Sequence, residues 1–208
     1  AAKFNNLTSG NHVINLSLGI GWGSGVTWSD LEADWTAGSY ASLFNATDAV
    51  VVVAAGNDGA SCASNDMANC NAIATVLTLD PDTADEAIVA GALDAAGTGI
   101  ATYSNQAGTL KQRYLMASGE TGYKLQSNNS NAAGTSFSAP RISGAAAIVR
   151  HKFPNLTGKQ TASILLLTAD KDIDGNGIDE FSGVSDVFGH GKLDLGTALS
   201  PVGSLGIQ

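Results

Sequence analysis

The run Ala-Val-Val-Val-Val-Ala-Ala at residues 49–55 constrains the fold of this chain more than any other segment. An apolar, β-branched run with no polar face is typical of a strand buried on both sides within a parallel sheet. Parallel strands need crossover connections, and these are usually helices that cover the two faces of the sheet. The run therefore predicts an α/β fold in which a parallel sheet is flanked by helices.

Other segments fit that alternation. Strands are expected at 12–19, 87–93 and 114–117, and helices at 29–45, 138–153 and 157–169. Thr157 is expected to cap the last helix, and Pro140 is expected in the first turn of the helix over 138–153. The length of 208 residues suits one domain over 1–208.

Charge and hydropathy exclude two classes of partner. The formal net charge of -9 should repel a phosphate backbone, so nucleic acid is not expected as a partner. The longest apolar runs, 49–55 and 144–149, are too short for a transmembrane segment. No signal peptide is visible at Ala1, and the chain opens as if an upstream segment had been removed.

Cys62 and Cys70 flank a short polar loop. Their even number and proximity favour a disulfide, and hence an oxidising compartment. The alternative is a pair of idle thiols.

The segment Gly134-Thr135-Ser136-Phe137-Ser138-Ala139-Pro140 places Ser136 where a loop enters a helix. A helix N-terminus offers free amides and partial positive charge, which favour an oxyanion nearby. Ser136 is therefore a candidate nucleophile; the alternative is an ordinary helix cap.

Asn57 follows Gly56 directly after the apolar run. Sites in open α/β sheets gather at the carboxyl ends of strands, and an asparagine amide can donate to a developing oxyanion. The alternative is a turn asparagine.

Five segments resemble motifs of the subtilisin-like (subtilase, S8-type) serine proteases, in family order. They are 13–19, 52–57, 116–119 (with Ser118 where the family has proline), 134–140 and 188–194. The resemblance covers nearly everything from 12 to 199 and implies the C-terminal, serine-bearing part of a subtilisin-like fold lacking its N-terminal strands. The serine motif at 134–140 followed by 188–191 is also similar to the secreted bacterial autotransporter branch, which implies a secreted or cell-surface protein.

The resemblance implies a role for each matched residue. Ser136 would attack the scissile carbonyl as a serine endopeptidase, and Asn57 would donate to the oxyanion together with the Ser136 amide. The substrate would lie along Ser17, Leu18, Gly19, Ala54, Ala55 and Gly56.

The family's Asp-[Ser/Thr]-Gly turn and its His-Gly-Thr-type helix start do not occur in this chain. His151 follows Ser136 by fifteen residues, largely along one expected helix, and His12 stands at the far end of its strand. His190 sits between two glycines, which indicates a turn. We therefore expect an N-terminal segment of the same precursor to supply Asp and His, and this chain alone to be inactive.

Two other functions can be compared with the sequence. A subtilase remnant that binds peptides or partners without cleaving them stays open. An α/β-hydrolase esterase is excluded because no Gly-x-Ser-x-Gly surrounds Ser136.

Asp172, Asp174 and Asn176, followed by Gly177, have the alternating oxygen spacing of a calcium loop. No glutamate stands at the twelfth position, so an EF-hand is incomplete. Calcium is expected there, with a solvated acidic loop as the alternative; no cofactor is needed for the chemistry.

Overall fold

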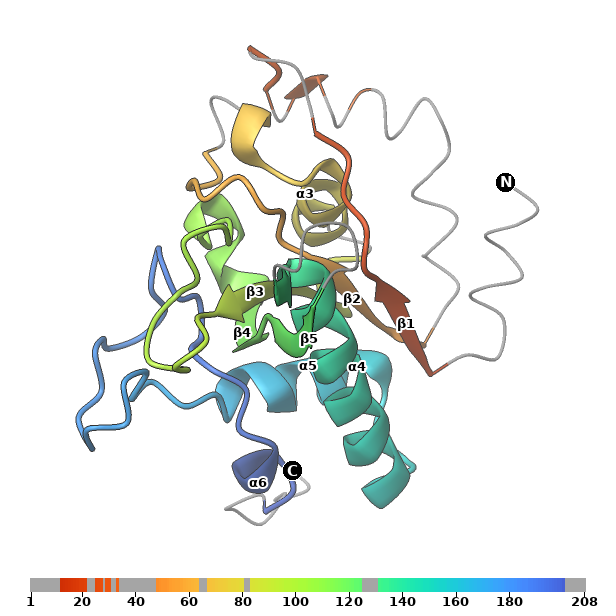
Figure 1. Cartoon of the computed structure of the whole chain (residues 1–208). Helices are drawn as coiled ribbons and strands as arrows, with labels where there is room; N and C mark the ends of the chain where they lie inside the picture. Colours follow the sequence, from red (N-terminus) through yellow and green to blue (C-terminus); the bar gives the residue numbers. More distant parts are fainter. Residues whose placement is uncertain are drawn as a thin grey trace.

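A computed structural model describes residues 12–21, 25–27, 29–30, 33, 48–63, 67–80, 83–124 and 131–200. Its centre is a parallel sheet with the spatial order β1-β2-β3-β4 (Figure 1). The strands are β1 (Val13–Leu16), β2 (Val50–Ala54), β3 (Ala87–Leu93) and β4 (Tyr114–Ser118). Every residue of β2 and of β3 is buried, which confirms the double-sided burial expected from their apolar runs.

Helices cover both faces of this sheet, as expected. One face packs against α4 (Thr135–Lys152) and α5 (Gly158–Leu167), and the other against α3 (Ala72–Leu79) and the 3-10 helix η3 (Gly108–Arg113). Alternate residues of β2 divide between the two cores, with Val50 and Val52 facing α4 and Val51 and Val53 facing α3. The remaining described elements are η2 (Met67–Asn69), the antiparallel pair β5 (Glu120–Lys124) and β6 (Asn131–Ala133), and α6 (Leu195–Ala198).

The helix expected from residue 138 begins earlier, at Thr135. The Thr135 amide donates to the Asn57 side chain at 2.9 Å, so a residue at the end of β2 satisfies the start of α4. Pro140 consequently lies in the second turn, and the expectation that it lies in the first is wrong. Its nitrogen cannot donate to the Ser136 carbonyl, yet the helix continues to Lys152.

Of the other expected boundaries, one is confirmed, one differs, and one cannot be compared. The cap at Thr157 is confirmed as a reciprocal pair, in which its hydroxyl accepts from the Gln160 amide and its own amide donates to Gln160 Oε1. The strand expected over 12–19 ends at Leu16, and the helix expected over 29–45 lies almost wholly outside the described residues. Among the described helices, none is long and apolar enough to cross a bilayer.

Candidate active site

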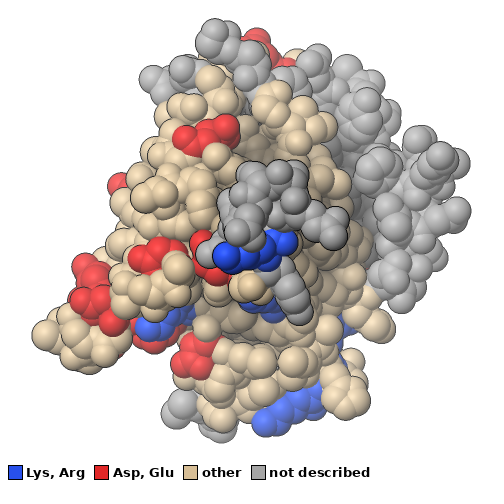
Figure 2. Space-filling view, viewed as in Figure 1, with Lys and Arg blue, Asp and Glu red and all other residues tan. Residues whose placement is uncertain are grey.

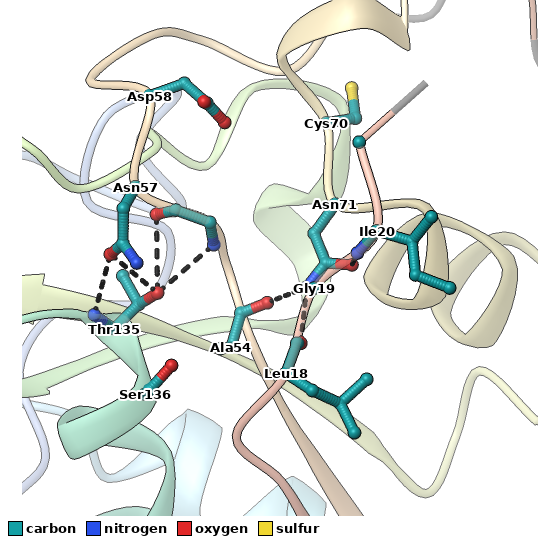
Figure 3. A pocket seen from close by; sticks show the side chains of 12 residues that line it. Leu18, Gly19, Ile20, Ala54, Asn57, Asp58, Cys70, Asn71, Thr135 and Ser136 are labelled. Atoms are coloured by element: carbon teal, nitrogen blue, oxygen red, sulfur yellow. Dashed lines mark hydrogen bonds between the residues drawn. The ribbon is translucent and has the colours of Figure 1, made fainter. Parts of the chain in front are cut away.

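A cleft of about 300 Å³ opens at the carboxyl ends of β1 and β2, beside the start of α4 (Figure 3). It is lined by Leu18, Gly19, Ile20, Gly21, Ala54, Gly56, Asn57, Asp58, Cys70, Asn71, Thr135 and Ser136. Most of the residues predicted for the site therefore lie together.

Two of the predicted substrate residues lie outside this lining. The Ser17 hydroxyl accepts a hydrogen bond from Asn15 Nδ2 at 2.9 Å. Ala55 is only 4% exposed. The walls of the cleft are thus Leu18–Gly21 on one side and the segment from Ala54 to Asp58 on the other.

Ser136 is the second residue of α4, and the helix cap is Gly134. A capping role for Ser136 is therefore wrong, because its side chain lies within the first turn and lines the cleft. The first amides of a helix have no acceptor within the helix, so the Ser136 amide stands at a positive helix end.

The orientation of the Asn57 carboxamide is set by Thr135. Asn57 Oδ1 accepts from the Thr135 amide at 2.9 Å and contacts the Thr135 hydroxyl at 3.1 Å. The Thr135 hydroxyl also accepts from the Gly56 amide at 3.2 Å. Because Oδ1 is occupied in this way, the Asn57 NH₂ group is the end available to a ligand in the cleft.

Gly56 has the backbone conformation that the turn between β2 and Asn57 requires. Its φ is +107°, and a Cβ there would clash with the Asn105 side chain. Asn105 is 1% exposed and holds the turn from behind, donating to the Ala55 carbonyl at 3.1 Å and accepting from the Asp58 amide at 2.8 Å.

The side chains that hold this site in place, Thr135, Asn71 and Asn105, were not predicted for it from the sequence, and neither were the lining residues Ile20, Gly21 and Asp58. Thr135 lies inside the motif 134–140, so its position beside Ser136 was the available signal. Asn71 precedes the apolar stretch that forms α3 and accepts from the Ile73 amide as its N-cap, which is a helix-start signal. Nothing near Asn105 in the sequence marks it.

None of the three histidines lines the cleft. His12 and His151 line a separate cavity together with Val13, the first residue of β1. The His190 amide donates to the carbonyl of Tyr114, the first residue of β4, at 2.9 Å. All three histidines thus lie toward the amino ends of parallel strands, whereas Ser136 and Asn57 lie at the carboxyl ends.

The acidic loop after α5 brings Asp172 and Asp174 together with Glu180, with one oxygen from each within 4.8 Å of the others. Asn176 lies beside this group: its Nδ2 donates to Asp174 Oδ2 at 3.0 Å, and its Oδ1 accepts from the Ile178 amide at 2.8 Å. Backbone amides donate to Asp172 and outweigh the effect of its desolvation, so its pKa lies below the usual value. The space-filling view shows acidic side chains along the left of the face on which this loop lies (Figure 2).

Cys62 and Cys70 form a disulfide with a Cα–Cα distance of 4.8 Å, as expected. Both half-cystines are buried, and Cys70 borders the cleft directly before Asn71.

Comparisons with known proteins agree with this geometry. A family model described as the Subtilase family matches residues 1–191. Subtilisin DY of Bacillus licheniformis is 30% identical over 163 residues, which is 77% of this chain and 50% of that protein. The autotransporter lipoprotein NalP of Neisseria meningitidis is 36% identical over 98 residues, 47% of this chain and 8% of that protein.

Among solved structures, the prenylagaramide maturation protease PagA has a TM-score of 0.59 at 22% identity. The alignment covers 92% of this chain and 61% of PagA. At that identity the likeness concerns the fold. The chain spans about half the length of the subtilisin that it matches.

Proposed function

This chain belongs to the subtilase family of serine peptidases, and from that membership we propose that Ser136 is the nucleophile of an endopeptidase. One observation carries the proposal: Ser136 and Asn57 face the same cleft from α4 and from the end of β2. The Asn57 NH₂ group is the free end of its carboxamide, which suits a donor to an oxyanion.

The chemistry follows from this pair. Ser136 Oγ would attack the carbonyl carbon of the scissile peptide bond and lose its proton to a base. Asn57 Nδ2 and the Ser136 amide would donate to the carbonyl oxygen as it becomes negative. The C–N bond then breaks, the amine leaves with a proton, and water releases the acyl group from Ser136.

We propose that the base and its orienting carboxylate come from a polypeptide segment outside these 208 residues. The support is the placement of His12, His151 and His190 away from the cleft. Fifteen residues of α4 separate Ser136 from His151, which corresponds to about 22 Å along the helix axis. Within the same proposal, the substrate is a polypeptide that lies along the two walls of the cleft.

The compartment proposed is extracellular or the cell surface. A buried disulfide persists in oxidising surroundings, and one relative is named as an autotransporter lipoprotein.

We also propose calcium binding by Asp172, Asp174 and Glu180, supported by their three convergent hard oxygens. Asn176, expected as a ligand, accepts from the Ile178 amide through Oδ1 and keeps a second lone pair on that oxygen for a cation.

The test is labelling with a fluorophosphonate probe, which reacts only with an activated serine. The complete precursor-derived enzyme should be labelled at Ser136 and should hydrolyse peptides. Ser136→Ala should lose both properties while its melting temperature stays unchanged, since a small, partly exposed side chain is exchanged. Ser182→Ala, at an exposed loop serine, serves as the matched control.

The 208-residue chain alone should bind peptides without cleaving them. Cleavage by the isolated chain would contradict the proposed external base. An unlabelled complete enzyme that still binds peptides would favour the alternative, a non-catalytic binding module.

A further inference from the structure

Asn71 connects the two walls of the cleft, with dashed lines from its carboxamide to Leu18 and to Ala54 in Figure 3. Its Nδ2 donates to the Leu18 carbonyl at 3.0 Å and to the Ala54 carbonyl at 2.5 Å. Leu18 lies just beyond β1, and Ala54 is the last residue of β2, so the two carbonyls stand on opposite sides of the cleft. One carboxamide therefore uses both of its N–H bonds to join two segments.

This link lies just where pairing between the strands has stopped. The register of β1 and β2 ends at Leu16 opposite Val53. Beyond that pair, no direct hydrogen bond joins Leu18–Gly21 to the segment 54–58 among the described residues. Where the cleft begins, hydrogen bonds from Asn71 thus replace the backbone hydrogen bonds between β1 and β2.

The environment of Asn71 allows it little freedom. The side chain is buried, with the residue 4% exposed, and its Oδ1 accepts from the Ile73 amide at 3.1 Å and the Ile20 amide at 3.4 Å. A Cβ on Gly19 would lie only 3.1 Å from Asn71 Nδ2, so the wall formed by Leu18–Gly21 packs closely against the Asn71 carboxamide. A buried amide with its donors and acceptor satisfied holds one geometry, because any displacement leaves polar groups unpaired.

We propose that Asn71 is a positioning residue that fixes the separation of the two cleft walls, and so sets discrimination among P1 side chains. P1 is the substrate residue whose carbonyl is attacked. This inference rests on the proposed peptidase function, because that function places the P1 side chain between the walls. A substrate with glycine at P1 places no side chain there.

One substitution separates this role from the capping of α3. Asn71→Asp keeps the shape and remains a good N-cap, with its charge at a helix N-terminus. It loses the donor, however, and sets a carboxylate oxygen against the carbonyls of Leu18 and Ala54. Asn69→Asp is the matched control, because the exposed Asn69 side chain makes no hydrogen bond with the described residues.

The experiment measures kcat and KM of the complete enzyme on peptides that differ only at P1, with glycine, alanine, leucine or phenylalanine. In Asn71→Asp, the ratio of kcat/KM between the best and the worst side-chain-bearing substrate should shrink by about 10-fold. The P1 glycine peptide should change by less than about twofold, and Asn69→Asp should match the wild type throughout. A uniform loss across all four peptides, or an unchanged ratio, would overturn the inference.

A second measurement tests the positioning role of Asn71 without requiring the proposed peptidase activity. If the wild-type enzyme hydrolyses no peptide, the function fails, and amide hydrogen exchange then tests Asn71. Residues 18–21 and 54–58 should exchange about 10-fold faster in Asn71→Asp than in Asn69→Asp, because local opening is easier. Equal rates would refute the positioning role. If Asn71→Asp does not fold, Asn71→Ser, which keeps a capping hydroxyl but cannot span both walls, replaces it in both measurements.

Discussion

Thr135 decides which end of the Asn57 carboxamide faces the cleft. Its amide can only donate, so it must meet Asn57 Oδ1, which leaves the NH₂ group for a ligand. The proposed nucleophile and the residue that orients Asn57 are therefore adjacent in one motif, since Thr135 directly precedes Ser136.

Replacing Asn57 by alanine in the complete enzyme should lower kcat by about 10²–10³ with little change in KM. That magnitude was measured for the oxyanion-hole asparagine of subtilisin itself and is borrowed from the family. Asn57→Asp should be similarly impaired, because it keeps the shape but lacks the donor. Steady-state kinetics give the answer, and an unchanged kcat for either variant would reduce Asn57 to a turn residue.

At this scale, sequence reasoning found two residues that line the cleft, Ser136 and Asn57, and missed the side chains that hold the cleft in place. Ser136 and Asn57 stand in local patterns that can be read from their neighbours. Asn71 contacts Leu18, 53 residues earlier, and Asn105 contacts Ala55, 50 residues earlier. Such partners are created by the fold, so no local pattern indicates them.

Among the elements, β2 and β3 were predictable because continuous apolar runs have few other uses. α3 was not predicted, because it is short and rich in residues that also favour strands. It is helical because Asn71 caps it and because the Thr75 and Thr78 hydroxyls donate to carbonyls one turn earlier, those of Asn71 and Ala74. The disulfide then ties the segment before α3 to the loop that follows β2.

Opening the Cys62–Cys70 bond should lower the free energy of unfolding by about 2.5 kcal/mol at most, because the closed loop is short. The measurement is denaturant unfolding with and without a reductant. A double Cys→Ser variant should unfold alike in both conditions. Two thiols that titrate in the denatured, unreduced protein would contradict the bond.

The acidic loop offers an element-scale test of the calcium proposal. Calcium at about 100 times its Kd should stabilise the fold by about 2.7 kcal/mol, seen as a higher melting temperature. Asp172→Asn should abolish that shift, whereas Asp179→Asn, in the same loop but outside the cluster, should keep it. A melting curve indifferent to both calcium and chelator would remove the proposal.

Across the whole molecule, the carboxyl and amino ends of the parallel strands carry different groups of residues. The carboxyl ends carry the cleft, and the amino ends carry polar contacts such as the 2.8 Å ion pair between the buried Arg150 and the exposed Asp48. His190 belongs to the second group, with Nε2 placed 3.2 Å from the Gln112 carbonyl. Burial lowers its pKa, and the nearby charges of Arg113 and Lys171 act in the same direction.

His190 should therefore make stability depend on pH. Because its pKa is lower in the folded protein than the ordinary value of 6.5, the unfolded chain binds a proton first as the pH falls. The contribution of neutral His190 is complete above about pH 6.5 and is lost as the pH falls from there through its folded pKa. The free energy of unfolding, measured from pH 7.5 downward, should fall over this range. In His190→Gln it should depend less on pH. An identical pH dependence in both proteins would contradict the assignment.

The distances along the chain between cleft residues also bear on how quickly the protein folds. Asn57 and Thr135 are 78 residues apart, and Asn71 reaches back 53 residues to Leu18. Contacts that close such long loops are slow to form, because the chain loses conformational entropy on closing the loop before the new contacts stabilise it. The cleft can exist only after β1, β2, α3 and the start of α4 have docked. Newly made molecules of the complete enzyme should therefore pass through a period before the proposed nucleophile is in place, during which a serine-directed probe would count only molecules that have finished folding.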